Sequence, residues 1–315
     1  MTDDFVSVQI IDDSDDEIEL ELDKEEMIIE VPKKVRKPRT KIELKEKKPK
    51  DPKPKTKDPK TKDPKIKTKD PKPKEKEPPI ISEAPICLLK KYYCEQGTLE
   101  IGADEAGRGP MLGRVYSGAV ILPKDDSFDH FKMKDSKKFT SKNSKKINEV
   151  AEYIKEHAIA WAVEYEDEKV IDEINILQAT QSAMHKAIKN VINQLAKKTD
   201  VLDPNFNNLL LLIDGNYFKQ LTVLNQTKTK LVTISYETVE GGDNKFTAIA
   251  AASILAKVER DKYIDDLCKE NPELIERYGI DSNKGYGSKK HMDGIKTYGI
   301  TKWHRRTFGL CKEYV

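Results

Sequence analysis

The chain has 315 residues, which suffices for one ordinary domain with extensions or for two small domains. Its 57 basic and 55 acidic residues give a formal net charge of +2, which disfavours a protein that coats nucleic acid but allows one that binds it along a local basic strip. No stretch approaches the roughly 18 apolar residues of a membrane-spanning helix, which excludes a helical membrane protein.

The cysteines give no sign of a zinc site. The four thiols, Cys87, Cys94, Cys268 and Cys311, form no Cys-x-x-Cys pair. The N-terminus is acidic, whereas a secretory signal would be basic and then apolar. We therefore expect a cytoplasmic protein with reduced thiols and no association with membranes.

The first eighty residues divide into two zones of opposite charge. Residues 1–31 carry 13 acidic residues and one Lys, and residues 32–80 carry 21 basic and 8 acidic residues in repeats of Lys-Asp-Pro-Lys. Dense proline opposes helix, and little apolar surface is available for a core, so we predict an acidic disordered tail and a Lys/Pro-rich flexible linker. Alternatively, the tail could fold back on the linker, the linker could bind polyanions, or the run 32–39 could act as a nuclear-import address.

Residues 81–315 have the pattern of one folded domain. The predicted elements, in chain order, are strands at 98–105 and 115–123, a helix at 143–157, a strand at 158–165, a helix at 177–198, strands at 209–215 and 229–239, a helix at 246–267, and a helical part from about 263 to 315. Strands that alternate with helices indicate an α/β sheet with helices on both sides.

The first candidate site follows the strand at 98–105. Asp104 and Glu105 are adjacent carboxylates, so the strand must end or bend near Glu105 if both are to reach one site. The turn Gly107-Arg108-Gly109 adds backbone freedom, exposed N–H groups and a guanidinium cation. A strand followed by an ordinary polar turn explains these residues equally well.

Two further carboxylates stand at the ends of predicted elements. Asp214 ends the apolar run at 209–215, where ligand sites of α/β sheets gather, although an ordinary Asp-Gly turn is the simpler interpretation. Asp243 precedes the helix at 246–267 and could cap that region or bind a metal. Asp261 lies deeper in the same helix, and we interpret it as an ion-pair partner of Arg260.

The C-terminal part carries the densest basic region of the folded chain. Its cations are Lys284, Lys289, Lys290, Arg305 and Arg306. Tyr286 lies between two glycines, so we expect an exposed ring suited to stacking on a nucleotide, although solvated cations and a packing tyrosine are the simpler interpretation. His304, as a lone histidine, is more often structural than catalytic.

In combination these stretches resemble the ribonuclease HII family over roughly residues 97–310. The matching strings, in order, are DEAGRGP at 104–110, DSKKF at 135–139, INILQAT at 174–180, GGD at 241–243 with AAASILAKVERD at 250–261, and NKGYGSKKH at 283–291 with WHRRTF at 303–308. The resemblance implies a ribonuclease H-like fold, with a central mixed β-sheet flanked by helices and a helical C-terminal extension.

The resemblance also implies the chemistry of the site. The implied metal ligands and catalytic residues are Asp104, Glu105, Asp214 and Asp243. Oxygen ligands suit Mg²⁺ or Mn²⁺, and two such ions would activate water for an in-line displacement that leaves a 5′-phosphate and a 3′-hydroxyl. The implied cofactors are therefore two Mg²⁺ or Mn²⁺ ions.

The implied substrate is an RNA–DNA hybrid or a DNA duplex that contains ribonucleotides, bound by a monomer. The residues implied to recognise the 2′-hydroxyl, which distinguishes RNA from DNA, are Gly107, Arg108, Gly109 and Tyr286. The residues implied to bind phosphates are Lys137, Lys138, Lys289 and Lys290.

Three residues depart from the family pattern. Arg114 stands where Pro is more usual, Gly242 replaces a commonly basic residue, and Thr307 replaces Ser. None of them removes an implied ligand. Two other functions stay open, namely a two-metal nuclease of the same fold that acts on DNA, and a non-catalytic nucleic-acid-binding module, for which carboxylates that repel phosphate would bring no advantage.

Overall fold

The computed structural model describes residues 89–94, 97–133, 144–198, 203 and 205–315. The predicted tail at 1–31, the predicted linker at 32–80, and Lys137 and Lys138 lie outside these ranges. No helix within the described ranges is both long enough and apolar enough to cross a membrane.

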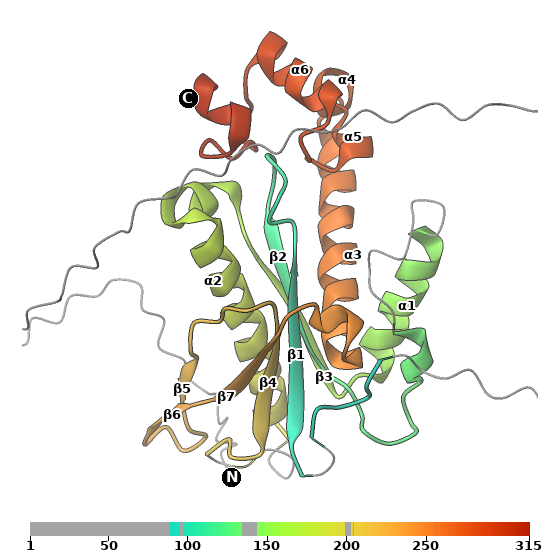
Figure 1. Cartoon of the computed structure of the whole chain (residues 1–315), viewed down its shortest axis with the longest axis vertical. Helices are drawn as coiled ribbons and strands as arrows, with labels where there is room; N and C mark the ends of the chain where they lie inside the picture. The colour runs from blue at the N-terminus through green and yellow to red at the C-terminus, as the bar shows by residue number, and fades with distance from the viewer. Residues whose placement is uncertain (1–88, 95–96, 134–143, 199–202, 204) are drawn as a thin grey trace, which may run out of the picture. The chain divides into compact units, whose positions relative to one another are not determined.

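A five-stranded mixed sheet has the strand order β3-β2-β1-β4-β7 (Figure 1). Its members are β1 (Leu99–Ala106), β2 (Val115–Ile121), β3 (Ala160–Glu166), β4 (Leu209–Asp214) and β7 (Ser235–Val239). β2 pairs antiparallel with β1 and β3, whereas β4 pairs parallel with β1 and β7. The carboxyl ends of the three parallel strands therefore lie at one edge, where ligand sites gather in α/β sheets.

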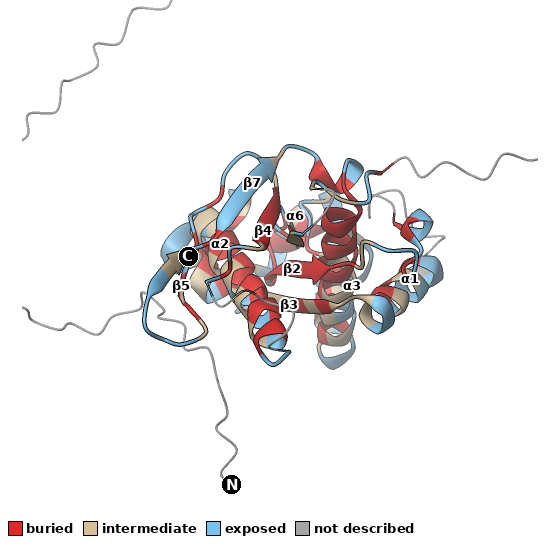
Figure 2. Cartoon of the chain, turned by 90° about the horizontal axis from the view of Figure 1, so that it is seen from below, coloured by how far each residue is buried: buried red, intermediate tan, exposed pale blue. Residues whose placement is uncertain are grey.

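Helices cover both faces of the sheet. The long helix α2 (Glu168–Ala196) packs on one face, and α3 (Thr247–Glu270) and α1 (Ser144–His157) pack on the other (Figures 1 and 2). Successive residues of a strand point to opposite faces, so Ile101 and Ala103 join the core under α2 while Gly102 faces α3. This arrangement confirms the predicted fold class.

The C-terminal extension is helical, as predicted, but begins later than residue 263 because α3 continues to Glu270. It contains α4 (Glu273–Tyr278), α5 (Ile280–Asn283), α6 (Lys289–Tyr298) and a final 3-10 helix (Gly309–Tyr314). Tyr278 and Ile295 are buried in a separate apolar cluster that also includes Met111 and Leu112. The extension thus packs on the segment that connects β1 to β2.

The single strand predicted at 229–239 is wrong, because the chain divides at Ile234. The short β6 (Leu231–Thr233) pairs with β5 (Thr222–Leu224) in a separate two-stranded sheet, and only β7 joins the central sheet. Ile234 is 1% exposed in the core under α2, and its N–H donates to the carbonyl of Leu221. The chain therefore passes from the two-stranded sheet to the central sheet at the buried residue Ile234.

The helix predicted to begin at residue 177 is preceded by another helical segment. α2 begins at Glu168, where the side chain of Asp167 accepts hydrogen bonds from the first backbone N–H groups. The backbone breaks at Asn175, which has a φ of 69°, and the Asn175 side chain accepts from the N–H groups of Leu177 and Gln178. Asn175 therefore caps the second segment, which begins near the predicted position.

Two glycines permit α3 to approach the sheet closely. A Cβ on Gly102 of β1 would lie 2.3 Å from the carbonyl carbon of Ala248, and a Cβ on Gly118 of β2 would lie 2.4 Å from the carbonyl oxygen of Ala252. Both contacts are with helix backbone, which cannot move aside as a flexible side chain can. The position of α3 over the sheet therefore depends on glycine at both sites.

We expect Gly102→Ala to destabilise the protein by at least about 1–3 kcal/mol, the usual cost of overpacking a dense core. Gly287→Ala is the control, because its Cβ would lie 3.5 Å from Met111, an ordinary contact. Urea unfolding of both variants measures the difference. Equal stability of the two variants would contradict the close packing of α3 on β1.

Two buried histidines link α6 to the segment that follows it. His291 Nδ1 lies 2.9 Å from the Tyr286 carbonyl oxygen, and His291 Nε2 lies 3.1 Å from His304 Nε2. The N–H of Thr301 donates to His304 Nδ1. A carbonyl only accepts and an N–H only donates, so both rings are neutral, with His304 donating through Nε2 and His291 through Nδ1. This structural role for His304 agrees with the prediction.

Lowering the pH should destabilise the protein through these rings. Burial lowers the pKa of His304 to about 3, and it also lowers the pKa of His291. Below about pH 6.5 the unfolded chain binds protons that the folded protein does not bind, so the free energy of unfolding decreases as the pH falls. His304 alone should account for a loss of about 2 kcal/mol between pH 6.5 and pH 5.

Urea unfolding at several pH values between 7 and 5 tests this expectation. His304→Asn should show a shallower dependence of stability on pH than the wild type. His157→Asn, at the exposed end of α1, is the matched control and should keep the wild-type slope. If the stability of His304→Asn depended on pH as steeply as that of the wild type, His291 and His304 would not be a neutral pair.

Candidate active site

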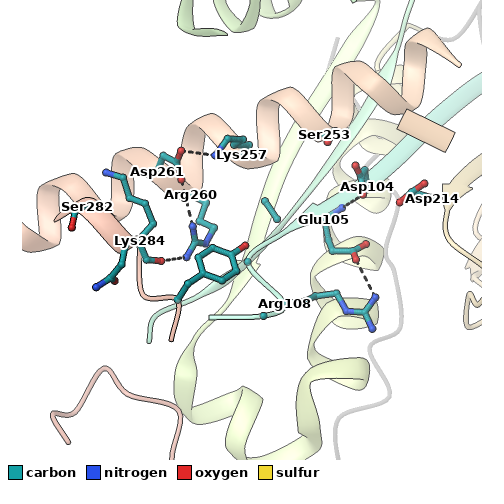
Figure 3. Close-up of a pocket in the computed structure, with 15 residues that line it drawn as sticks. Asp104, Glu105, Arg108, Asp214, Ser253, Lys257, Arg260, Asp261, Ser282 and Lys284 are labelled. Carbon is teal, nitrogen blue, oxygen red and sulfur yellow. Dashed lines mark hydrogen bonds and ion pairs between the residues drawn. The ribbon is translucent and has the colours of Figure 1, made fainter. Parts of the chain in front are cut away.

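A pocket of about 480 Å³ opens at the carboxyl edge of the parallel strands (Figure 3). Asp104 and Glu105, near the end of β1, and Asp214, at the end of β4, form one wall. The turn after β1, α3 and the segment around Tyr286 form the remainder. Three of the four predicted carboxylates are therefore brought together.

Asp104 lies at the centre of this acidic wall and is 5% exposed. Its Oδ1 accepts a hydrogen bond of 2.6 Å from the Glu105 N–H, and its side chain is also hydrogen-bonded to Ser253 of α3. Burial raises the pKa of Asp104 well above its ordinary value, and the nearby charges of Glu105 and Asp214 raise it further. The carboxylates thus strongly disfavour full ionisation in the absence of a cation.

Asp243, the fourth predicted carboxylate, does not line this pocket. It lies on a short 3-10 helix (Gly242–Asn244), is 1% exposed, and accepts a hydrogen bond from the Asn244 side chain at 3.0 Å. The N–H of Gly242 donates to Asp214 Oδ1 at 2.6 Å, which connects the two segments. Asp243 is therefore next to Asp214 along this contact but is not among the residues that line the pocket.

The donor chemistry of the acidic wall fits a hard divalent cation. The oxygen atoms that line this wall belong to Asp104, Glu105, Asp214 and Ser253, and such oxygens suit Mg²⁺ or Mn²⁺ better than zinc. As the side chains lie, no group of three His, Cys, Asp or Glu residues within the described ranges forms a complete metal site.

The turn after β1 forms the second part of the pocket. Gly107 has a φ of 96°, and a Cβ there would lie 2.5 Å from Nε of the buried Arg260, so only glycine fits. A Cβ on Gly109 would lie 3.3 Å from the ring of Tyr286, which is 50% exposed. Arg108 forms an ion pair of 3.1 Å with Glu105. The exposed ring predicted for Tyr286 thus lies beside Gly109.

A cationic wall faces the turn from α3 and α5. Lys257 forms an ion pair of 2.8 Å with Asp261, and Arg260 contacts the same carboxylate at 3.4 Å, which agrees with the pairing predicted for Asp261. Arg260 also donates to the Lys284 carbonyl. The sequence did not predict Ser253, Lys257 or Arg260 as site residues. Polar residues within a helix look the same in sequence whether they face solvent or a pocket.

Arg305 is buried, whereas the sequence placed it in a basic strip. It is fully inaccessible, and its five N–H donors all bond to backbone carbonyls at 2.7–3.1 Å. The accepting residues are Gly107, Arg108, Pro110, Gly113 and Arg114. Arg305 thus holds the whole segment that follows β1, and no spacing in the sequence revealed this contact.

The remaining predicted phosphate-binding residues lie away from the carboxylates. Lys289 and Lys290, at the start of α6, line a separate depression of about 530 Å³, and Lys290 Nζ donates to the Ile275 carbonyl. The acidic wall and these lysines are therefore parts of different surfaces.

Two of the three departures from the family pattern, Thr307 and Arg114, have local explanations. Thr307 retains the hydroxyl of the usual Ser and donates to Asp172 Oδ1 at 2.6 Å. Arg114 lies over the rings of Tyr165 and Tyr263 at 4.0 and 4.4 Å. These contacts fit both departing side chains into the fold.

Comparisons with known proteins agree with the geometry. The model of the family described as Ribonuclease HII matches residues 101–311. The chain is 42% identical to "Ribonuclease HII" of Parabacteroides distasonis over 221 residues, covering 70% of this chain and 95% of the relative, and 42% identical to "Ribonuclease HII" of Bacteroides thetaiotaomicron over 218 residues, covering 69% and 93%.

A solved structure shares the fold. A mutant protein of Bst-RNase HIII is similar with a TM-score of 0.51 at 16% identity, over 69% of each chain. Both relatives matched by sequence are bacterial, and they lend no support to a nuclear address at residues 32–39. The family match and these relatives show that the chain belongs to the ribonuclease HII family, whose members are endoribonucleases.

Proposed function

We propose that this ribonuclease, which acts on RNA–DNA hybrids as its family does, also cuts duplex DNA on the 5′ side of an embedded ribonucleotide. The products would carry a 5′-phosphate and a 3′-hydroxyl. The observation that carries the proposal is the meeting of Asp104, Glu105 and Asp214 in one pocket with the Gly107–Gly109 turn and Tyr286. One chain supplies all of these groups, so the reaction needs no second subunit.

The carboxylates are proposed to hold the metal. Asp104, Glu105, Asp214 and Asp243 would bind two Mg²⁺ or Mn²⁺ ions, which would supply an activated water and stabilise the leaving oxygen. Asp104 is positioned for this by Ser253 and by the N–H of Glu105. Asp214 is positioned by the N–H of Gly242. These bonds direct the carboxylates before substrate arrives, which favours catalysis.

The turn and Tyr286 are proposed to select RNA. The backbone N–H groups of the Gly107–Gly109 turn would bond to the 2′-hydroxyl, and the ring of Tyr286 would pack on the same sugar. The ring of Tyr286 lies beside Gly109 of this turn, which supports the assignment. Arg108, whose side chain is half exposed, would leave its ion pair with Glu105 and contact a phosphate.

Phosphates farther along the duplex are proposed to bind lysines. The predicted set is Lys137, Lys138, Lys289 and Lys290, of which the first two lie outside the described residues. Lys289 and Lys290 are exposed at the start of α6. We place them on the flank of the substrate rather than at the cleaved bond, because they line a different depression from the carboxylates.

A cleavage assay tests the proposed reaction. With Mg²⁺ or Mn²⁺, a labelled DNA duplex holding one ribonucleotide should be cut on its 5′ side, and EDTA should abolish cutting. Asp104→Asn should lose at least about 100-fold in rate, because metal activation is worth several kcal/mol and each 1.4 kcal/mol is tenfold.

The control is Asp266→Asn, which makes the same change at a half-exposed position of α3 paired with Lys269. It should retain the wild-type rate. Cutting of long RNA–DNA hybrid alone would keep the nuclease but remove the proposed role of the turn and Tyr286. Cutting of neither substrate would favour a binding module.

Metal binding should also appear as a change in stability. Without metal, Asp104→Asn should be more stable than the wild type, because it removes one of the repelling carboxylates. With Mn²⁺ at one hundred times its Kd, the wild type should gain about 2.7 kcal/mol, and the variant should gain much less. Urea unfolding with Mn²⁺ or EDTA measures both effects. An equal gain in both proteins would place the metal elsewhere.

A further inference from the structure

Arg305 is placed to orient the backbone of the Gly107–Gly109 turn. Its guanidinium donates to the carbonyl oxygens of Gly107 and Arg108 at 2.7 and 3.0 Å. A trans peptide unit is planar, and its N–H points opposite to its C=O. Because both carbonyls are directed at Arg305, the N–H groups of Arg108 and Gly109 are directed away from it.

The next bonded carbonyl shows what lies opposite Arg305 at its own peptide unit. The Pro110 carbonyl also accepts from Arg305, and the N–H of the same peptide unit, that of Met111, donates to the Gly285 carbonyl at 2.9 Å. Gly285 is the neighbour of Tyr286 in the pocket wall. At this peptide unit the N–H therefore points away from Arg305 and toward the segment that carries Tyr286.

The two N–H groups are available to a ligand. Arg108 and Gly109 both line the pocket, and neither N–H donates a hydrogen bond within the described part of the chain. Two adjacent donors on one side of a turn suit a single oxygen atom with two lone pairs, such as a hydroxyl.

We infer that Arg305 is a positioning residue that holds the Arg108 and Gly109 N–H groups as a donor pair for the ribose 2′-hydroxyl. The inference rests on the proposed function, in which this turn recognises that hydroxyl. Arg305 makes no contact with the sugar and acts through the carbonyls. Lysine cannot replace it, because an ammonium has three donors and lacks the planar fork that reaches five carbonyls.

Binding of matched duplexes tests the inference without cleavage. In an Asp104→Asn background, the Kd is measured for a duplex with one ribonucleotide and for the same duplex with DNA only. Adding Arg305→Lys should lower the ratio of the two affinities about tenfold, which is the worth of two hydrogen bonds. The control adds Ile295→Ala, in the buried apolar cluster of the C-terminal extension, and should lower stability while leaving the ratio unchanged.

Each outcome has a definite meaning. An unchanged ratio with Arg305→Lys, or an equal reduction with Ile295→Ala, would overturn the inference, because the effect would then be absent or only a general loosening. If the Asp104→Asn parent binds both duplexes equally well, the proposed recognition of the 2′-hydroxyl is wrong, and the inference about Arg305, which rests on it, is wrong as well. If the parent prefers the ribonucleotide duplex and only Arg305→Lys loses this preference, the result supports both the proposed recognition and the role of Arg305.

A second measurement covers the case in which Arg305→Lys does not fold. In ¹⁵N-labelled Asp104→Asn protein, the ribonucleotide duplex should shift the backbone N–H signals of Arg108 and Gly109 together with the guanidinium signals of Arg305. The DNA-only duplex should not shift them. Two amide signals that respond equally to both duplexes, or an Arg305 guanidinium signal that does not follow them, would overturn the inference.

Discussion

Burial of one carboxylate beside two others at the end of a parallel sheet is the constraint on which the described structure depends. Asp104 is buried beside Glu105 and Asp214, and both its burial and these charges raise its pKa, so ionising it in the folded chain is unfavourable. The remainder of the domain must supply the compensating stability. It does so through the core under α2 and through α3, which approaches the sheet over Gly102 and Gly118.

The pocket combines two opposite electrostatic requirements. A phosphodiester is attracted by cations and repelled by carboxylates. Lys257 and Arg260 lie across the pocket from the carboxylates and are held by Asp261, which keeps their charges near the pocket without letting them neutralise Asp104. Separation of the two walls suits the proposed binding of metal and phosphate in one cavity.

The C-terminal extension completes the pocket and positions its turn. Tyr286 lies on the segment between α5 and α6, and its carbonyl is fixed by the neutral pair of His291 and His304. Arg305 follows immediately and fixes the carbonyls of the turn after β1. Loss of the extension would therefore remove Tyr286 and Arg305, which are proposed to select RNA and to position the turn.

The sequence by itself predicted most of the elements of the central sheet and placed three carboxylates of the pocket near strand ends. Alternation and apolar runs are local properties, so they place Asp104, Glu105 and Asp214 near strand ends, and the topology of parallel strands then brings them to one edge. Local signals were less reliable at Ile234, where burial in a core formed by distant residues divides a predicted strand in two.

Only the tertiary structure decided which basic side chains are buried, which line the pocket, and where Asp243 lies. Arg305 and Arg306 are adjacent and look alike in sequence, but Arg305 is inaccessible and bonds to carbonyls as far as 198 residues away, while Arg306 is exposed. A buried guanidinium requires that every donor be satisfied, and the satisfying carbonyls come from a turn at the other end of the domain. Hydrogen bonds between segments so distant depend on packing, which the local pattern of a sequence does not encode.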